Sequence, residues 1–307
     1  MRNPLVRWAL ARERRGNGKP SISQVFRRPQ SDLYESTSSF RGSGAPFVFS
    51  SAVCRSDFFH LPLYHFWCSK IKEKPRYHRK QWEFVFIAHA LYERGFLKEG
   101  SNGVGFGVGR EPLADLFASY GCKITASDLA PEEAVGTGWI ETDQHAYDVS
   151  SLYAGISNQQ DFDNLVDFRS INMNSIPRDL LNFDFCYSSC SIEHVGSLAL
   201  SKAFLKNSLG VLKVGGISIH TTELNLSSDT STIEDGPTVM WRRSDFIDLA
   251  SELLEAGHYV APLDFYIGKD VIDEYIDFPP FSHLHHLRLQ LSKYVSTSAG
   301  IIIQRRH

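Results

Sequence analysis

The chain has little net charge for its length. Its 307 residues include 32 lysines and arginines and 35 acidic residues, which leaves a formal net charge of −3. This balance provides no bulk attraction to nucleic acid, and the later part of the sequence has no contiguous basic and aromatic stretch. We therefore expect no nucleic-acid partner. The hydrophobic content of 42% is typical of a globular protein with one large domain and an accessory segment.

Long apolar segments and cysteine are also scarce. No run approaches the roughly 20 apolar residues that span a bilayer, so we expect no integral membrane segment. The cysteines are odd in number and form no C-x-x-C pair, which favours reduced thiols in the cytoplasm over disulfides or a zinc site. They are Cys54, Cys68, Cys122, Cys186 and Cys190. A catalytic thiolate at Cys190 is an alternative to a packing thiol.

The first 77 residues differ in composition from the rest. Residues 1–50 are rich in Arg, Ser, Gly and Pro and show no periodic core, so we predict a disordered basic tail. An organellar transit peptide, or a segment that binds an anionic lipid or sugar phosphate, is an alternative. Residues 51–77 are rich in aromatic side chains and too apolar for a free linker. We expect this accessory segment to pack on the main domain.

Glycines alternate with apolar residues over positions 103–109, which read Gly-Val-Gly-Phe-Gly-Val-Gly. Because glycine has no Cβ, such a loop turns tightly out of a strand and lets a bulky ligand approach the backbone. Asp128 follows about 20 residues later, at the end of the next strand-like run, where an acid accepts hydrogen bonds from ribose hydroxyls. The pattern predicts a nucleotide-cofactor loop, and the alternative is a glycine-rich turn that binds nothing.

The glycine spacing indicates which nucleotide. A dinucleotide fingerprint needs G-x-G-x-x-G, and in the three possible frames the last glycine is replaced by Val108, Arg110 or Pro112. What remains is G-x-G-x-G with an acid at the end of the second strand. In this the chain resembles the class I S-adenosylmethionine-dependent methyltransferases. The resemblance extends over residues 78–305 and implies S-adenosyl-L-methionine as the cofactor.

The resemblance also implies which residues hold that cofactor. They are Gly105, Gly107 and Gly109 in the loop, Asp128 at the ribose, Asn172 and Met173 at the adenine, and Ser188 and Ser189 near the reactive methyl group. The family has an acid two residues before the first loop glycine, and this position is Gly103 here. We expect Glu111, or another polar group, to substitute for that acid at the cofactor's amino-acid end.

Helix and strand patterns alternate along the rest of the chain. Helices are predicted from His78 to a stop at Gly95 and over 112–120, 197–212 and 244–256, and strands over 259–266 and 294–303. Residues 211–216, Val-Leu-Lys-Val-Gly-Gly, resemble the family's turn before the fifth strand. We expect an α/β fold: a Rossmann-like open, mostly parallel seven-stranded sheet with helices on both faces, formed by residues 78–307 with an insertion at 267–293.

Candidates for a general base follow the predicted fourth and fifth strands, where ligands collect in open α/β sheets. They are His194, His220, Glu193 and Glu223. An activated methyl group needs mainly positioning, and a base is required when the acceptor proton has a high pKa. With polar residues at these strand ends, we expect methyl transfer to a polar small-molecule or carbohydrate acceptor, as in an O-methyltransferase.

Two other functions remain open. One is an NAD-binding oxidoreductase or epimerase, which is disfavoured because G-x-G-x-x-G and a Tyr-x-x-x-Lys pair are absent. The other is a catalytically silent scaffold with the same fold, which Gly103 suggests. The insertion contains His283, His285 and His286, but no ordered fourth ligand accompanies them, so we expect no metal. Arg79 and Lys80 open the first predicted helix and could reach the cofactor site, because cations oppose the helix dipole there and imply a compensating anion. A solvated basic helix start is the alternative.

Overall fold

The computed structural model describes residues 49–134, 144–282 and 284–307. Nearly all of the predicted basic tail over residues 1–50 therefore lies outside the described residues, as does His283 of the insertion. Within the described ranges, no helix is both long and apolar enough to cross a membrane.

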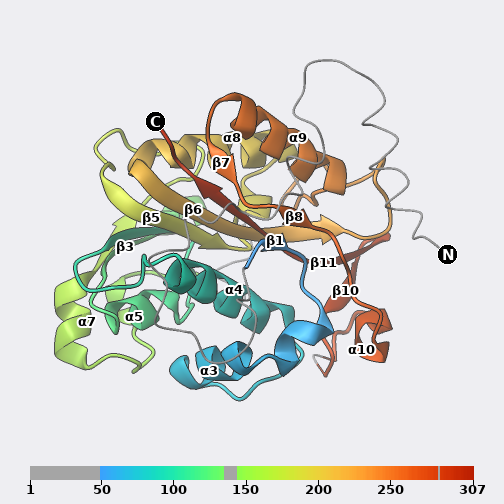
Figure 1. Ribbon diagram of the computed structural model, residues 1–307, viewed down its shortest axis with the longest axis horizontal. Coiled ribbons are helices and arrows are strands. Elements are labelled where there is room, and N and C mark those ends of the chain that lie inside the picture. The colour runs from blue at the N-terminus through green and yellow to red at the C-terminus, as the bar shows by residue number, and fades with distance from the viewer. Residues whose placement is uncertain (1–48, 135–143, 283) are drawn as a thin grey trace.

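A mostly parallel sheet forms the centre of the molecule (Figure 1). The described residues contribute nine strands to it, in the order β4-β3-β2-β5-β6-β11-β10-β9, with β7 also paired to β11. Its parallel strands are β2 (Asn102–Phe106), β3 (Lys123–Asp128), β4 (Val166–Ser170), β5 (Phe183–Ser189) and β6 (Leu212–Asn225). Strand β11 (Tyr294–Gln304) runs antiparallel to β6.

The expected α/β fold is confirmed, but the expected number of seven strands is wrong. The insertion supplies two further strands, β9 (Ile276–Asp277) and β10 (Arg288–Leu291), which extend the sheet beyond the start of β11. The far end of β11 pairs with β7 (Tyr259–Val260). Because β11 is 11 residues long, both β10 and β7 pair with it at different heights.

The single strand expected over 259–266 is two short ones. Strand β7 joins the main sheet, whereas β8 (Leu263–Asp264) pairs in parallel with β1 (Ser51–Ala52). Pairing with β1 draws the chain away from the main sheet after Val260 and connects the accessory segment to the body of the protein.

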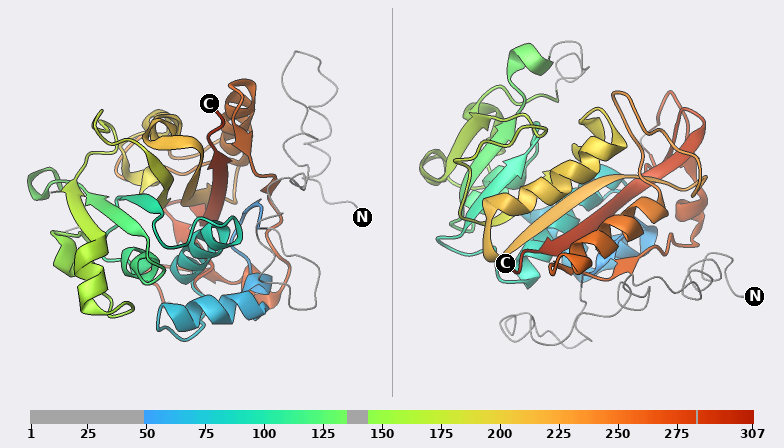
Figure 2. Two further views of the ribbon diagram at one scale, coloured as in Figure 1. Left: turned by 60° about the vertical axis from the view of Figure 1, so that its left-hand side comes forward. Right: turned by 90° about the horizontal axis from the view of Figure 1, so that it is seen from above.

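Helices cover both faces of the sheet (Figure 1). One face carries α3 (Pro62–Lys70), α4 (Arg79–Glu93), α5 (Leu113–Ala118) and α7 (Gln159–Leu165), and the other carries α8 (Leu198–Ser208) and α9 (Arg243–Glu255). The view from above in Figure 2 has α8 and α9 in front of the sheet. Shorter elements are α6 (Pro131–Ala134), α10 (Val271–Glu274), η3 (Ser56–His60), η4 (Val149–Leu152), η5 (Ile192–His194) and η6 (Leu209–Val211).

Each face of the sheet has its own hydrophobic core. Along β5, Phe185 and Tyr187 belong to the core under α4 and α5, whereas the intervening Cys186 belongs to the core under α8 and α9. This alternation is the period of two that a strand imposes on its side chains. In β6, the same alternation decides which residues face α4 and α5 and which face α8 and α9.

The accessory segment belongs to the same core as α4. Tyr64 and Trp67 are fully buried, and the indole Nε1 of Trp67 donates to His89 Nδ1 at 3.1 Å. Helix α4 begins where the Nδ1 atom of His78 accepts from the backbone nitrogen of Lys80, and it ends just before Gly95, whose φ is +74°. Both ends agree with the sequence-based prediction.

Candidate functional site

The glycine loop leaves the carboxyl end of β2 and leads into α5. A Cβ added at Gly105 would lie 2.6 Å from the ring of Tyr187, so this glycine admits an aromatic side chain of β5. Gly107 and Gly109 have φ angles of +57° and +50°, which residues with a side chain rarely adopt. A Cβ at Gly109 would lie 2.7 Å from the backbone oxygen of Gln144, so this glycine brings another loop against the turn.

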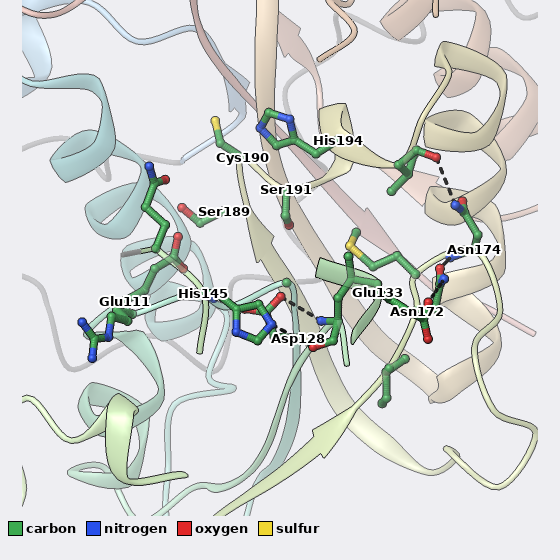
Figure 3. Close-up of a pocket in the computed structure, with 18 of the residues that line it drawn as sticks. Glu111, Asp128, Glu133, His145, Asn172, Asn174, Ser189, Cys190, Ser191 and His194 are labelled. Carbon is green, nitrogen blue, oxygen red and sulfur yellow. Dashed lines mark hydrogen bonds between the residues drawn. The ribbon is translucent and has the colours of Figure 1, made fainter. Parts of the chain in front are cut away.

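A cavity of about 560 Å³ opens beside this loop, at the carboxyl ends of β2, β3 and β5. Such a position is where open α/β sheets bind ligands. Eight of the residues predicted from the sequence line it: Gly107, Gly109, Glu111, Asp128, Asn172, Met173, Ser189 and His194. Figure 3 shows Glu111 and Asn172 on opposite sides of this space, with Asp128 between them and His194 at its far end.

Asp128 ends β3 and holds three backbone groups. Its Oδ1 accepts from the nitrogen of Leu129 at 2.9 Å, and its Oδ2 accepts from the nitrogens of Gly109 at 3.1 Å and Ala146 at 3.2 Å. Burial raises the pKa of this carboxyl, and the backbone donors oppose that effect. The carboxylate therefore both orders the cavity wall and lines the cavity.

Glu111 provides a buried carboxylate with unused hydrogen-bonding capacity. Its Oε2 is shielded from solvent and has no hydrogen-bond partner within the described part of the chain. Burial raises the pKa of its carboxyl well above the ordinary value, against the field of Lys80, which lines the same cavity. A buried acceptor of this kind is costly unless a ligand donates to it.

Gly103 has no room for the acid that the resembled family carries. A Cβ at that position would collide with the ring of Phe185 on the neighbouring strand. Phe185 and Ile124, which a side chain at Gly103 would meet, belong to the core under α4 and α5, so an acid there would be buried in that core and not in the cavity wall.

Asn172 does not present a free amide to the cavity. Its Nδ2 donates to Glu133 Oε2 at 2.7 Å, and its Oδ1 accepts from the nitrogen of Asn174 at 2.9 Å. Glu133 also lines the cavity, and Met173 is largely buried beside it. Asn172 therefore organises the loop, and the carboxylate of Glu133 is the nearby acceptor that the sequence analysis missed.

Two cations at the start of α4 are compensated by buried acids, as the helix dipole argument predicted. Glu83 lies 3.2 Å from Arg79 Nη1 and 3.3 Å from Lys80 Nζ. Arg79 Nη2 also pairs with Glu223 Oε1 at 2.5 Å. Burial opposes ionisation of Glu83, but Lys80 and Arg79 outweigh it, so the pKa of Glu83 is lowered.

Glu193 and Glu223 lie beneath the cavity rather than in its wall. Thr222 Oγ1 donates to Glu193 Oε2 at 3.1 Å, and Glu223 accepts from Ser296 in addition to Arg79. Burial raises the pKa of both carboxyls. Glu223 therefore connects β6 to α4, and Glu193 connects η5 to β6. Neither residue lines the cavity.

Cys190 stands at the bottom of the cavity. Its thiol is 3.5 Å from Arg79 Nη1, and burial raises its pKa well above the ordinary value. The thiol therefore stays protonated, so the alternative of a catalytic thiolate at this position is not supported. Ligand atoms of Cys190, Glu193 and Glu223 lie within 4.8 Å of one another, but the guanidinium of Arg79 already supplies a cation there.

His194 lines the cavity and has a defined tautomer. Its Nδ1 lies 2.8 Å from the backbone oxygen of Pro237, and because a carbonyl only accepts, Nδ1 carries the hydrogen. In the neutral ring the lone pair is then on Nε2, which lies 3.9 Å from Glu193 Oε1. Burial lowers the pKa of His194 to about 4, so the ring is neutral at physiological pH.

His220 does not reach the cavity, and the expectation that it faces the acceptor space is wrong. It projects from β6 toward α8, where its ring packs on Phe204 at 5.5 Å between centroids. Its two nitrogens contact Ser188 Oγ at 2.7 Å and Ser218 Oγ at 2.6 Å. Ser188, expected near the methyl group, is thus a buried partner of His220, because alternate residues of a strand face opposite sides.

Several lining residues were not among the predicted site residues. They are Lys80, Phe84, Arg110, Leu129, Glu133, Gln144, His145, Ile171, Asn174, Cys190, Ser191, Val195 and Gly196. Lys80 was noted as within reach of the site, and the position of Asn174 and Ser191 next to predicted residues was a usable signal. His145 had none, since it precedes β4 in a segment without periodicity.

The histidines of the insertion pack on the start of α4. The ring of His286 stacks on His78 at 4.7 Å, and its Nδ1 lies 2.7 Å from Asp277 Oδ2. His285 packs edge-on against Tyr77. These contacts explain the polar character of the insertion by packing and ion pairing.

No protein-family model matches this chain, and no curated protein matches it either. Similar folds occur among solved structures. Magnesium protoporphyrin IX methyltransferase from Synechocystis, with bound SAH, is 11% identical, with 81% of this chain and 97% of that chain covered and a TM-score of 0.44. TehB from Haemophilus influenzae is 10% identical, with 80% and 67% covered and a TM-score of 0.46. The [4+2]-cyclase SpnF is 15% identical, with 71% and 80% covered and a TM-score of 0.45.

The sheet itself defines the fold class. Strands β4-β3-β2-β5-β6 are parallel, β11 is antiparallel to β6, and both β10 and β7 pair with β11, which is a Rossmann-like open α/β sheet. The identities above are too low to say anything about cofactor or acceptor, and one of the three proteins is a cyclase. Because one fold supports many chemistries, the residues of the cavity are what indicate the function.

Proposed function

We propose that this chain transfers a methyl group from S-adenosyl-L-methionine to a hydroxyl group of a polar small molecule or glycan. The observation that carries the proposal is the order of polar groups along the cavity. Glu111, Asp128 and the Asn172 loop follow one another along it (Figure 3). The cofactor presents an ammonium, a ribose diol and an adenine in the same order.

The cavity suits each part of this molecule. The unpartnered Oε2 of Glu111 is an acceptor for the ammonium group, and Lys80 supplies a cation for the neighbouring carboxylate. Asp128 faces the diol. Leu129, Ile171 and Met173 provide apolar contacts for the adenine, and Glu133 provides an acceptor for its amino group.

Gly107 leaves room for the ligand at the centre of the cavity. A Cβ there would lie 2.7 Å from Ser191 Cβ and 3.3 Å from Met173 Sδ, so any side chain would narrow the passage between the two loops. Its φ of +57° also keeps the turn open toward the cavity. The backbone can therefore approach a bulky ligand closely.

When bound, the cofactor supplies a methyl group that its sulfonium already activates, so this chain's residues have to position the acceptor and remove a proton. His194 is the candidate for the second task, since its Nε2 carries the lone pair and it lines the cavity. A hydroxyl acceptor needs such a base because its own pKa is high. The Pro237 carbonyl keeps the imidazole in this tautomer, and burial keeps it neutral.

Among the described residues, Glu193 is the acidic group nearest the proton-accepting atom, with its Oε1 3.9 Å from His194 Nε2. A positive charge on the imidazole would favour the ionised carboxylate over the neutral form that burial favours. Phe84, Cys190 and Val195 line the cavity near His194 and exclude water from the reacting groups. Acceptor selection would then depend on this mixed polar and apolar wall.

Binding of labelled S-adenosyl-L-methionine and of NADH to the full chain tests the cofactor. We expect saturable binding of S-adenosyl-L-methionine and no binding of NADH. The reverse result would favour the NAD-binding oxidoreductase instead. Incubation of the full chain with the labelled cofactor and fractionated metabolites, glycans and lipids tests the acceptor. Label in a polar fraction supports the proposal when the His194→Asn variant, assayed in parallel, leaves that fraction unlabelled.

A further inference from the structure

His145 is a buried histidine in the wall of the cofactor cavity. It lies between α6 and η4, is 2% exposed, and packs edge-on against Tyr147 at 4.8 Å between ring centroids. Figure 3 shows its ring beside Asp128. Neither the fold nor the glycine loop requires a histidine here, so its chemistry needs a separate explanation.

Its tautomer is determined by one contact. The Nε2 atom lies 2.9 Å from the backbone oxygen of Leu129, and because a carbonyl can only accept, Nε2 is the donor. In the neutral imidazole, Nδ1 is then a hydrogen-bond acceptor. This Nδ1 atom is buried and has no partner within residues 49–134, 144–282 and 284–307.

A buried acceptor without a donor has lost its hydrogen bonds to water and gained none in return. Such a group fits a site where a ligand supplies the missing hydrogen. His145 and Asp128 both line the cavity, and Figure 3 shows the two side chains beside each other. The ligand group that fits here is thus a donor next to Asp128, as a hydroxyl would be.

Asp128 has little capacity left for two such hydroxyls. A carboxylate offers about four acceptor positions. The backbone nitrogens of Leu129, Gly109 and Ala146 use three of them, at 2.9, 3.1 and 3.2 Å. One position remains for a ligand, whereas a ribose diol brings two hydrogens.

The bond between Asp128 and Ala146 also determines where His145 lies. Ala146 follows His145 in the chain, and Gln144 on its other side has its backbone oxygen against Gly109, where a Cβ would lie only 2.7 Å away. The segment that carries His145 is therefore held at one end against the glycine loop and at the other end by Asp128. Its imidazole is preorganised beside the carboxylate.

We propose that the ribose diol of the cofactor is shared between two residues, with one hydroxyl donating to Asp128 and the other to His145 Nδ1. The proposal rests on the proposed function, because the diol is that of S-adenosyl-L-methionine. It changes the expectation that Asp128 alone accepts from both hydroxyls. It also gives a role to a residue that has no counterpart in the motifs of the sequence.

Calorimetric titration of the full chain with S-adenosylhomocysteine and with its 2′-deoxy and 3′-deoxy analogues tests the proposal. For the wild type, loss of either hydroxyl should weaken binding by about tenfold, since each hydroxyl has its own acceptor. In His145→Gln the amide keeps a donor near Nε2 but no acceptor near Nδ1. This variant should bind S-adenosylhomocysteine about tenfold more weakly than the wild type.

The decisive comparison is between ligand and variant. The analogue that lacks the hydroxyl bound by His145 should bind His145→Gln and the wild type equally, because neither complex contains that hydrogen bond. The analogue that lacks the other hydroxyl should bind His145→Gln more weakly than it binds the wild type. His145→Asn, whose carbonyl oxygen takes the place of Nδ1, should retain more affinity than His145→Gln. These three results together support a shared diol.

Equal losses for all three ligands in His145→Gln would mean a purely structural effect and would overturn the proposal, as would no loss at all. A wild type that binds no S-adenosylhomocysteine would instead refute the proposed function, and this inference with it. The wild-type titration therefore separates the two failures before any variant is compared.

Discussion

Replacement of Glu111 by glutamine should weaken cofactor binding and stabilise the protein without cofactor. The carboxylate Oε2 lacks a partner until an ammonium group arrives, so binding adds a hydrogen bond between charged groups. Such a bond contributes about 1.5 to 3 kcal/mol. Its loss corresponds to roughly 10- to 150-fold weaker binding of S-adenosylhomocysteine.

The same variant should shift thermal stability in a way that depends on pH. Burial raises the pKa of Glu111 in the folded protein above its value in the unfolded chain. Above the unfolded value the unfolded chain releases this proton more readily than the folded protein does, so the folded state loses stability as the pH rises. Glutamine does not titrate. The melting temperature of Glu111→Gln should therefore exceed that of the wild type near neutral pH, and the difference should vanish below about pH 4, where glutamate is protonated in both states.

Two controls sharpen the experiment. 5′-Methylthioadenosine has no amino-acid group, so its affinity should not change in Glu111→Gln. Glu252 pairs with Lys206 on the surface, and Glu252→Gln should leave both affinity and melting temperature unchanged. An unaltered affinity of Glu111→Gln for S-adenosylhomocysteine, with no gain in melting temperature, would refute the role assigned to this carboxylate.

Three further changes test other parts of the site. Gly107→Ala places a Cβ 2.7 Å from Ser191 Cβ at a φ of +57° and should abolish S-adenosylhomocysteine binding in calorimetry, while Gly210→Ala, with open space around it, should not. His194→Asn should lower kcat by about 100-fold with cofactor affinity retained. The wild-type kcat/KM should fall only below about pH 4, because burial has lowered the pKa of His194 from 6.5, and a midpoint near 6.5 would contradict that placement. His220→Asn should lower the melting temperature and leave kcat unchanged, since its ring bridges two buried serines, packs on Phe204 and does not line the cavity.

Much of the fold follows from local patterns in the sequence. The helix that begins after His78 has an apolar face, a capping side chain and a terminal glycine, and each of these acts over a few residues. The glycine loop and Asp128 likewise follow from short-range requirements for a turn and a strand end. Predictions based on such features agree with the structure to within a few residues.

The face of the sheet on which each side chain of a buried strand lies did not follow from local sequence patterns. Both faces of β6 are covered by helices, so the alternation of polar and apolar residues from Ile217 to His220 does not reveal which side chains reach the cavity. His220 and His194 were therefore equivalent candidates in the sequence. The packing of His220 on Phe204 separates them.

The sequence by itself determined the class of fold and the glycine loop beside the cavity, because a turn with positive φ and a strand followed by an acid are local requirements. Only the tertiary structure decided how many hydrogen-bonding positions remain at Asp128, that Glu111 Oε2 and His145 Nδ1 lack partners among the described residues, and that His194 lines the cavity whereas His220 does not. These properties depend on which distant backbone groups and side chains already occupy each polar atom. Segments far apart in the chain, such as the glycine loop and residues 144–146, settle that occupancy when they pack together.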